Sequence, residues 1–206
     1  HVLGTVSTTL SVIADLVVIL FVGFYFAIDP GLYRRGILLL IPDKGQKRAE
    51  EVLDRLQQKL RRWLIGKLAL MLFVGVATAL GLWAMHMPLI AILAGLAALL
   101  DFIPNIGPII SAVPAMLLAL THSPADALWV AVLYLVVQVV ESYILQPLVQ
   151  QRAVSLPPSL TLCAQVLAGT LLGMFGLIIA TPLTVALMNL VQALYVEDYL
   201  GKKGNP

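Results

Sequence analysis

The chain has 206 residues, of which 60% are apolar (Ala, Val, Ile, Leu, Met, Phe, Trp, Tyr or Cys) and only 12% are charged, and its net charge is +2. Soluble domains usually carry about 25% charged residues, so this composition indicates a protein whose solvent is largely lipid. The lone cysteine, Cys163, excludes an intrachain disulfide, and the sequence has neither metal-site Cys and His spacing nor a hydrolase or phosphate-loop signature. We therefore expect an integral membrane protein that is not an enzyme and has no metal or cofactor.

The first apolar run, residues 5–28, is long enough to cross a bilayer. Its helix would measure roughly 36 Å, against a hydrocarbon core of ~30 Å. Asp15 lies near its middle with Ser11 and Thr8 on the same face, so it is a candidate for a water path or for contact with another subunit. Because the chain begins with His1 rather than Met, we expect it to be part of a longer protein.

Residues 30–63 have a different pattern, which predicts a cytoplasmic amphipathic helix. Apolar side chains recur at helical spacing, at Ala49, Val52, Leu53, Leu56, Leu60 and Trp63. Asp43 and Gln46 fit a capping box before this stripe. Ten of the 13 Lys and Arg residues lie between Arg34 and Lys67, but acidic residues alternate with them, so no nucleic-acid partner is expected.

Residues 64–206 are predicted to form a membrane core. Residues 65–85 make a second full span, and residues 125–149 make a later one. Two pairs of shorter apolar arms flank the later span, at 88–121 and 157–197. Three of the four arms would reach only about 20–24 Å, less than the bilayer core. We therefore predict two re-entrant or broken helical hairpins, and short interrupted segments at corresponding positions are typical of transporter binding sites.

The basic residues predict the orientation in the membrane. The cluster from Arg34 to Lys67 is placed in the cytoplasm, which leaves His86 and His122 outside. Arg152 and the C-terminal Lys202 and Lys203 then return to the cytoplasmic side. This scheme gives the two hairpins opposite orientations, as in an inverted repeat.

The tip of the first predicted hairpin carries a carboxylate. Pro104 and Pro108 lack amide donors and Gly107 permits close backbone approach, so the helix is expected to break here. Asp101, with Asn105 nearby, is a functional candidate, because ionisable residues within a membrane are usually functional. The alternative is that Asp101 only caps the helix that follows.

The long span carries a second carboxylate within its apolar stretch. Tyr134, Gln138 and Glu141 lie at i, i+4 and i+7, on one helix face. One interpretation is a proton or cation site at Glu141. The alternative is a protonated Glu141 that makes a structural hydrogen bond to Gln138 or to a broken helix.

Glycines mark the second predicted hairpin. Gly169 and Gly173 form a GxxxG pair, which in an apolar run usually indicates close helix packing. Gly173 and Gly176 together predict the hairpin tip, and Pro182 predicts a kink in the arm that follows.

Taken together, these motifs resemble the AI-2E family of transporters. The resemblance is carried by residues 101–108 with Ala112-Val113-Pro114, Gln138 and Glu141 with Pro147, Leu156-Pro157-Pro158, and residues 169–176 with Thr181-Pro182-Leu183. Position 105 is often aromatic in that family, whereas this chain has Asn105. Members usually carry further spans and an extracytoplasmic segment before the matching region.

The resemblance implies a multi-pass protein of the bacterial cytoplasmic (inner) membrane that assembles as a homo-oligomer such as a pentamer. It implies export of a small molecule such as autoinducer-2, with exchange of Na⁺ or Li⁺ for protons as the alternative, and the predicted hairpins favour an alternating-access mechanism. A non-transporting membrane scaffold is the third hypothesis. The expected partners are membrane lipid and a small-molecule or monovalent cation substrate.

The predicted fold class is all-α: a polytopic membrane protein with two re-entrant or broken helical hairpins and a cytoplasmic amphipathic helix. The residues expected to carry transport or ion coupling are Asp101, Asn105, Gln138 and Glu141, with Asp15 and Tyr134 as further candidates.

Overall fold

The computed structural model describes residues 30–150 and 157–201, and every regular element among them is a helix. This confirms the all-α fold class. The chain divides into two compact units between Asp54 and Arg55. The predicted first span with Asp15, and the basic residues Arg152, Lys202 and Lys203, lie outside the described residues.

The first unit contains α2 (Pro30–Leu39) and the start of α3 (Asp43–Ala84). Nε2 of Gln46 lies 3.4 Å from Oδ1 of Asp43 at the start of α3, which is a contact between side chains and not the pair of side chain-to-backbone bonds of a capping box. Arg34 and Asp54 form an ion pair at 3.0 Å, with both side chains substantially exposed. Exposed pairs of this kind contribute about 0–1 kcal/mol.

The predicted amphipathic helix and the second span are one continuous helix, because α3 runs for 42 residues without interruption. The boundary expected at residues 63–64 is therefore not a junction between two helices. It marks the point in α3 where the surface changes from amphipathic to largely apolar. Beyond residue 64 its buried stripe contains Lys67, Leu70, Val74, Thr78 and Leu82, whereas its exposed positions are apolar, at Ile65, Leu68, Leu72, Val76, Leu80 and Trp83. An apolar outer surface of this kind suits lipid.

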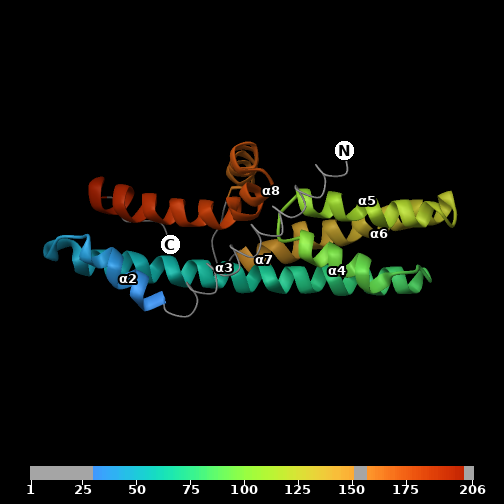
Figure 1. Ribbon diagram of the computed structural model, residues 1–206, viewed down its shortest axis with the longest axis horizontal. Coiled ribbons are helices and arrows are strands. Elements are labelled where there is room, and N and C mark those ends of the chain that lie inside the picture. Colours follow the sequence, from blue (N-terminus) through green and yellow to red (C-terminus); the bar gives the residue numbers. More distant parts are fainter. Residues whose placement is uncertain (1–29, 151–156, 202–206) are drawn as a thin grey trace, which may run out of the picture. The chain divides into compact units, whose positions relative to one another are not determined.

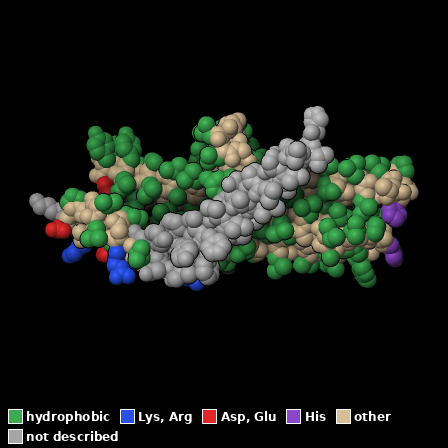
Figure 2. Space-filling view, in the orientation of Figure 1, with side chains coloured by type: hydrophobic (Ala, Val, Ile, Leu, Met, Phe, Trp, Pro, Cys, Tyr) green, Lys and Arg blue, Asp and Glu red, His purple; other side chains and the backbone are tan. Residues whose placement is uncertain are grey.

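Three helical segments in the described part of the chain are long and apolar enough to cross a membrane: Gly45–Ala84, Pro124–Val149 and Ser159–Tyr199. Two shorter apolar helices, Ile90–Leu100 and Ile106–Leu120, accompany them. Hydrophobic side chains cover much of the surface in the space-filling view (Figure 2).

The two shorter helices, α4 (Ile90–Leu100) and α5 (Ile106–Leu120), are joined by a tight break. Asn105 precedes α5 with a positive φ of 67°. A Cβ at Gly107 would meet the carbonyl oxygen of Leu100, so the chain can turn this sharply only with glycine at that position.

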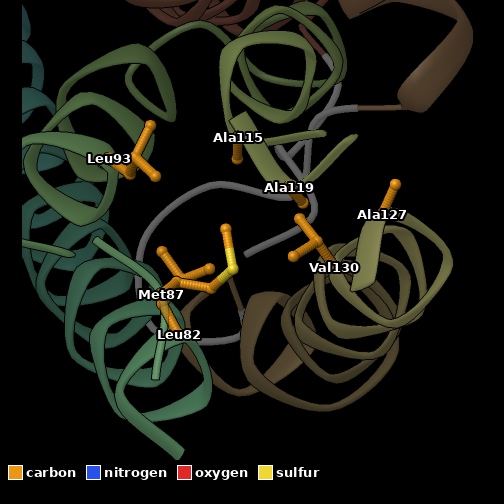
Figure 3. Packing of buried hydrophobic residues seen from close by; sticks show 7 residues of the cluster. All are labelled: Leu82, Met87, Leu93, Ala115, Ala119, Ala127 and Val130. Carbon is orange, nitrogen blue, oxygen red and sulfur yellow. The ribbon is translucent and has the colours of Figure 1, made fainter. Parts of the chain in front are cut away.

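The helices α5 and α6 (Pro124–Val140) pack closely side by side (Figure 1). Small side chains at Ser111, Ala115 and Ala119 line the buried face of α5, and such residues let helix backbones approach in a membrane. Figure 3 shows the hydrophobic cluster to which the two alanines belong, formed by Leu82, Met87, Leu93, Ala115, Ala119, Ala127 and Val130. This core fixes α3, α4, α5 and α6 as one packed group.

The predicted long span is interrupted by one π-helical turn. After α6 the chain forms η1 (Glu141–Leu145) and then α7 (Gln146–Gln150). Pro147 has no amide hydrogen, and in a regular helix its ring would clash with the carbonyl four residues earlier. A wider turn just before this proline relieves the clash, and isolated π turns are frequent at functional sites.

The last elements are α8 (Pro158–Leu190) and η2 (Val191–Tyr199). Gly173 breaks α8, with φ 61° and ψ −141°, and the ribbon changes direction there (Figure 1). A Cβ at Gly176 would meet the Ala168 carbonyl oxygen, so the two halves of α8 approach each other closely at this break. The depth of both breaks in the membrane stays a prediction.

Candidate functional site

Three buried charged side chains meet in the second unit. Nζ of Lys67 lies 2.9 Å from Oδ2 of Asp101 and 3.6 Å from Oε1 of Glu141. Their side chains are 6%, 1% and 5% exposed, respectively. The three residues come from α3, the end of α4 and the π turn η1, and we call them the Lys67–Asp101–Glu141 triad.

Lys67 is held in this position by the buried stripe of α3. It lies one helical turn before Leu70 and shares its face with Val74. Its neighbour Gly66 permits a close approach, because a Cβ there would meet the side chain of Val149 on α7. The lysine therefore projects into the helix packing and not toward water.

Asp101 is positioned by the break between α4 and α5. Its amide donates to the Ala97 carbonyl at 3.0 Å, which ends α4, and its carboxylate turns to Lys67. Among the described residues no side chain caps α5, so the alternative in which Asp101 caps that helix is wrong. Phe102 packs edge-on against Trp63 of α3, with ring centroids 5.9 Å apart, and this contact fastens the break beside α3.

Glu141 is positioned by the π turn. The amide of Gln146 donates to the Glu141 carbonyl five residues earlier, which widens the helix at this residue. The Glu141 carboxylate then meets Lys67 and does not bond to Gln138. The Gln138 amide instead donates to the Ser142 hydroxyl at 2.9 Å.

The charges of the triad do not balance when all three groups are ionised, because one ammonium faces two carboxylates. Oδ1 of Asp101 and Oε2 of Glu141 are buried and have no hydrogen-bond partner within the described part of the chain. Unpaired buried acceptors are costly. The arrangement is therefore suited to take up a proton or a small cation.

The other predicted site residues are distributed around the triad. Asn105 is exposed at the break, where its backbone adopts a positive φ. Tyr134 lies about two helical turns before Glu141 along α6, and its buried hydroxyl has no partner among residues 30–150 and 157–201. Gly173 and Gly176 form the second break, whereas Pro104, Gly107 and Pro108 belong to the first.

Sequence reasoning missed two residues. Lys67 belongs by sequence to the cytoplasmic basic cluster, although its spacing from Leu70 and Val74 places it on the buried stripe of α3. Gln165, which is 1% exposed, was not singled out, although a lone amide within an apolar arm is a visible signal.

Comparison with known proteins finds similarity to membrane transporters. The family model described as "AI-2E family transporter" matches residues 1–196. Among curated relatives, YrrI of Bacillus subtilis is 31% identical over 167 residues, covering 81% of this chain and 47% of that protein. YhhT of Escherichia coli is 34% identical over 133 residues, covering 64% of this chain and 38% of that protein. Both carry the description "putative transport protein".

A further relative, TqsA of Escherichia coli, is described as an AI-2 transport protein. It is 26% identical over 157 residues, covering 76% of this chain and 44% of that protein. The chain thus spans about half the length of the curated relatives that it matches. These names indicate transport and not enzymatic catalysis. Because the family model covers almost the whole chain, the chain belongs to the AI-2E family of membrane transporters.

Proposed function

We propose that the chain forms the transport core of a secondary transporter that exports a small solute. In this proposal the Lys67–Asp101–Glu141 triad binds the proton or monovalent cation that couples transport. The observation that carries it is the position of Nζ of Lys67, 2.9 Å from Asp101 and 3.6 Å from Glu141 in a buried site.

The coupling argument is electrostatic. Taking charges out of water costs several kcal/mol per ion unless partners compensate it. Binding of one proton or cation neutralises the excess carboxylate charge, and its release restores that charge. The free-energy difference between two conformations of the transporter therefore depends on whether the ion is bound. This dependence allows ion binding to shift the conformational equilibrium.

The breaks at Asn105 and Gly173 supply places where such a change can occur. Each combines a positive φ with a glycine that admits a backbone carbonyl at close range. Interrupted helices around a central site are typical of alternating-access transporters. The solute proposed is a small molecule of the autoinducer-2 kind, in line with the description of the relative TqsA.

A second candidate is monovalent cation/proton antiport without an organic solute. It is favoured by the carboxylate oxygens that have no partner in the described chain, Oδ1 of Asp101 and Oε2 of Glu141, because oxygen ligands suit small hard cations. In this case Lys67 would compete with the cation for the same carboxylates.

Flux measurements with the full-length protein in liposomes test and separate these functions. Labelled autoinducer-2 is loaded inside, and its efflux is compared with and without pH and sodium gradients. Solute efflux that responds to either gradient supports the exporter, and proton release driven by Na⁺ or Li⁺ alone supports the antiporter. A protein that moves neither the solute nor ions contradicts both.

A further inference from the structure

A hydrogen bond connects α8 to the break between α4 and α5. Nε2 of Gln165 donates to the carbonyl oxygen of Pro104 at 3.0 Å, across 61 residues of sequence. The same carbonyl accepts the Ile106 amide at 2.8 Å, and this second bond lies within the break itself. The contact with Gln165 therefore ties a distant helix to the segment that carries Asp101.

The chemistry of the two groups fixes the orientation of the Gln165 amide. A carbonyl oxygen only accepts, so the NH₂ group must face Pro104 and Oε1 must point away. Oε1 is buried and has no partner in the part of the chain that the structure describes. Because an unpaired buried acceptor is unfavourable, this side chain is held in place by its bond to Pro104 and not by a full set of contacts.

Asp101 lies three residues before Pro104, at the start of the same break. Only two residues lie between Asp101 and Pro104. A shift of the Pro104 carbonyl therefore moves the backbone that positions the Asp101 carboxylate. We propose that Gln165 is a positioning residue that holds Asp101 against Lys67 and makes the ion site respond to movement of α8. This inference rests on the proposed role of the triad.

Hydrogen exchange on the full-length protein in nanodiscs tests the contact without any transport measurement. Gln165→Met keeps the length of the side chain and removes its donor. We expect amides in residues 101–107 to exchange several-fold faster in this variant. The matched control is Thr161→Val, one turn earlier on the same buried face, whose hydroxyl faces its own helix at Pro157. Unchanged exchange in Gln165→Met would overturn the inference.

A second variant distinguishes positioning from a general loss of structure. In Gln165→Glu the protonated carboxyl can donate to Pro104, whereas the ionised form cannot. The charged groups of the ion site that Gln165 is proposed to position are Lys67, Asp101 and Glu141. We expect the flux of Gln165→Glu, relative to the wild type, to fall as pH rises from about 6 to about 9.

The flux measurement uses labelled autoinducer-2 and sodium as separate probes in liposomes. Gln165→Met should lower flux about fivefold at every pH, the size expected for one lost hydrogen bond. Thr161→Val should transport like the wild type. If both Gln165 variants match the wild type at every pH, the positioning role is wrong. If the wild type moves neither probe, the proposed function is wrong. The hydrogen-exchange result then tests on its own whether Gln165 holds the break at Pro104.

Discussion

Lys67 and Asp101 form an ion pair at 2.9 Å whose side chains are 6% and 1% exposed. Such a pair is weak evidence for stability, because well-packed apolar residues in its place are often neutral or stabilising. Lys67 lies on the buried face of the apolar part of α3. Ionisable residues in such segments are usually functional, so we attribute the pair to function.

The energetic coupling of the pair gives a first prediction. Lys67→Met removes the partner of both carboxylates, whereas Asp101→Asn leaves Lys67 its contact with Glu141. We expect Lys67→Met to lower the free energy of unfolding by about 3–5 kcal/mol, with a smaller effect for Asp101→Asn. The double variant should be more stable than the sum of the single effects implies. Thermal unfolding in detergent measures this cycle, and strictly additive effects would show that the pair is not coupled.

The glycines at the two breaks give a second prediction. Gly107→Ala and Gly176→Ala each bring a Cβ against a backbone carbonyl, at Leu100 and Ala168 respectively, and backbone cannot move aside cheaply. We expect either variant to yield little folded protein. Gly95→Ala in α4 is the matched control, because a Cβ added there would meet nothing within 4 Å. Size-exclusion profiles compare the three, and normal yields of Gly107→Ala would contradict the tight break.

The positive φ of Asn105 gives a third prediction. With ψ −42° this conformation lies outside the left-handed helical region, so glycine adopts it with the least strain and β-branched residues tolerate it poorly. Asn105→Gly should therefore leave stability unchanged or raise it, whereas Asn105→Val should lower it by about 1–2 kcal/mol. Equal melting temperatures for the two variants would be inconsistent with the backbone described for this break.

Much of the helical layout could be predicted from apolar run lengths and from proline and glycine. The sequence predicts a pair of apolar arms at residues 88–121 with a break near Pro104, and α4 and α5 lie within these bounds on either side of Pro104. The continuity of α3 was missed, because a change from an amphipathic to an apolar pattern was interpreted as a boundary although no residue between them breaks a helix.

The triad could be predicted only in part. Asp101 and Glu141 attract attention because carboxylates are rare in apolar segments. Lys67 does not, because a lysine at the end of a basic cluster is the ordinary signal for the cytoplasmic side. Which residue neutralises a buried carboxylate depends on the packing of three distant elements, and the π turn that presents Glu141 depends on how the helix adapts to Pro147. Neither follows from periodicity.

Membrane orientation gives a fourth prediction. His86 and His122 are exposed in the turns after α3 and α5, and Figure 2 shows histidine side chains on the surface. In a Cys163→Ser background, His86→Cys and His122→Cys should react with an impermeant maleimide added to intact cells. Gln57→Cys, exposed near the other end of α3, should react only after permeabilisation. The reverse labelling pattern would show that the protein has the opposite orientation in the membrane.

The central claim is that the triad carboxylates couple transport. Glu141→Gln and Asp101→Asn preserve side-chain shape and remove the titratable group, and Asp126→Asn at the start of α6 is the control carboxylate outside the triad. The most direct measurement is flux of the full-length variants in liposomes, with and without pH and sodium gradients, at matched oligomeric state. The account predicts that both triad variants assemble normally but lose transport or its response to the gradients, while Asp126→Asn transports like the wild type. Wild-type flux and wild-type gradient dependence in both triad variants would contradict it and would make these carboxylates structural hydrogen-bonding groups.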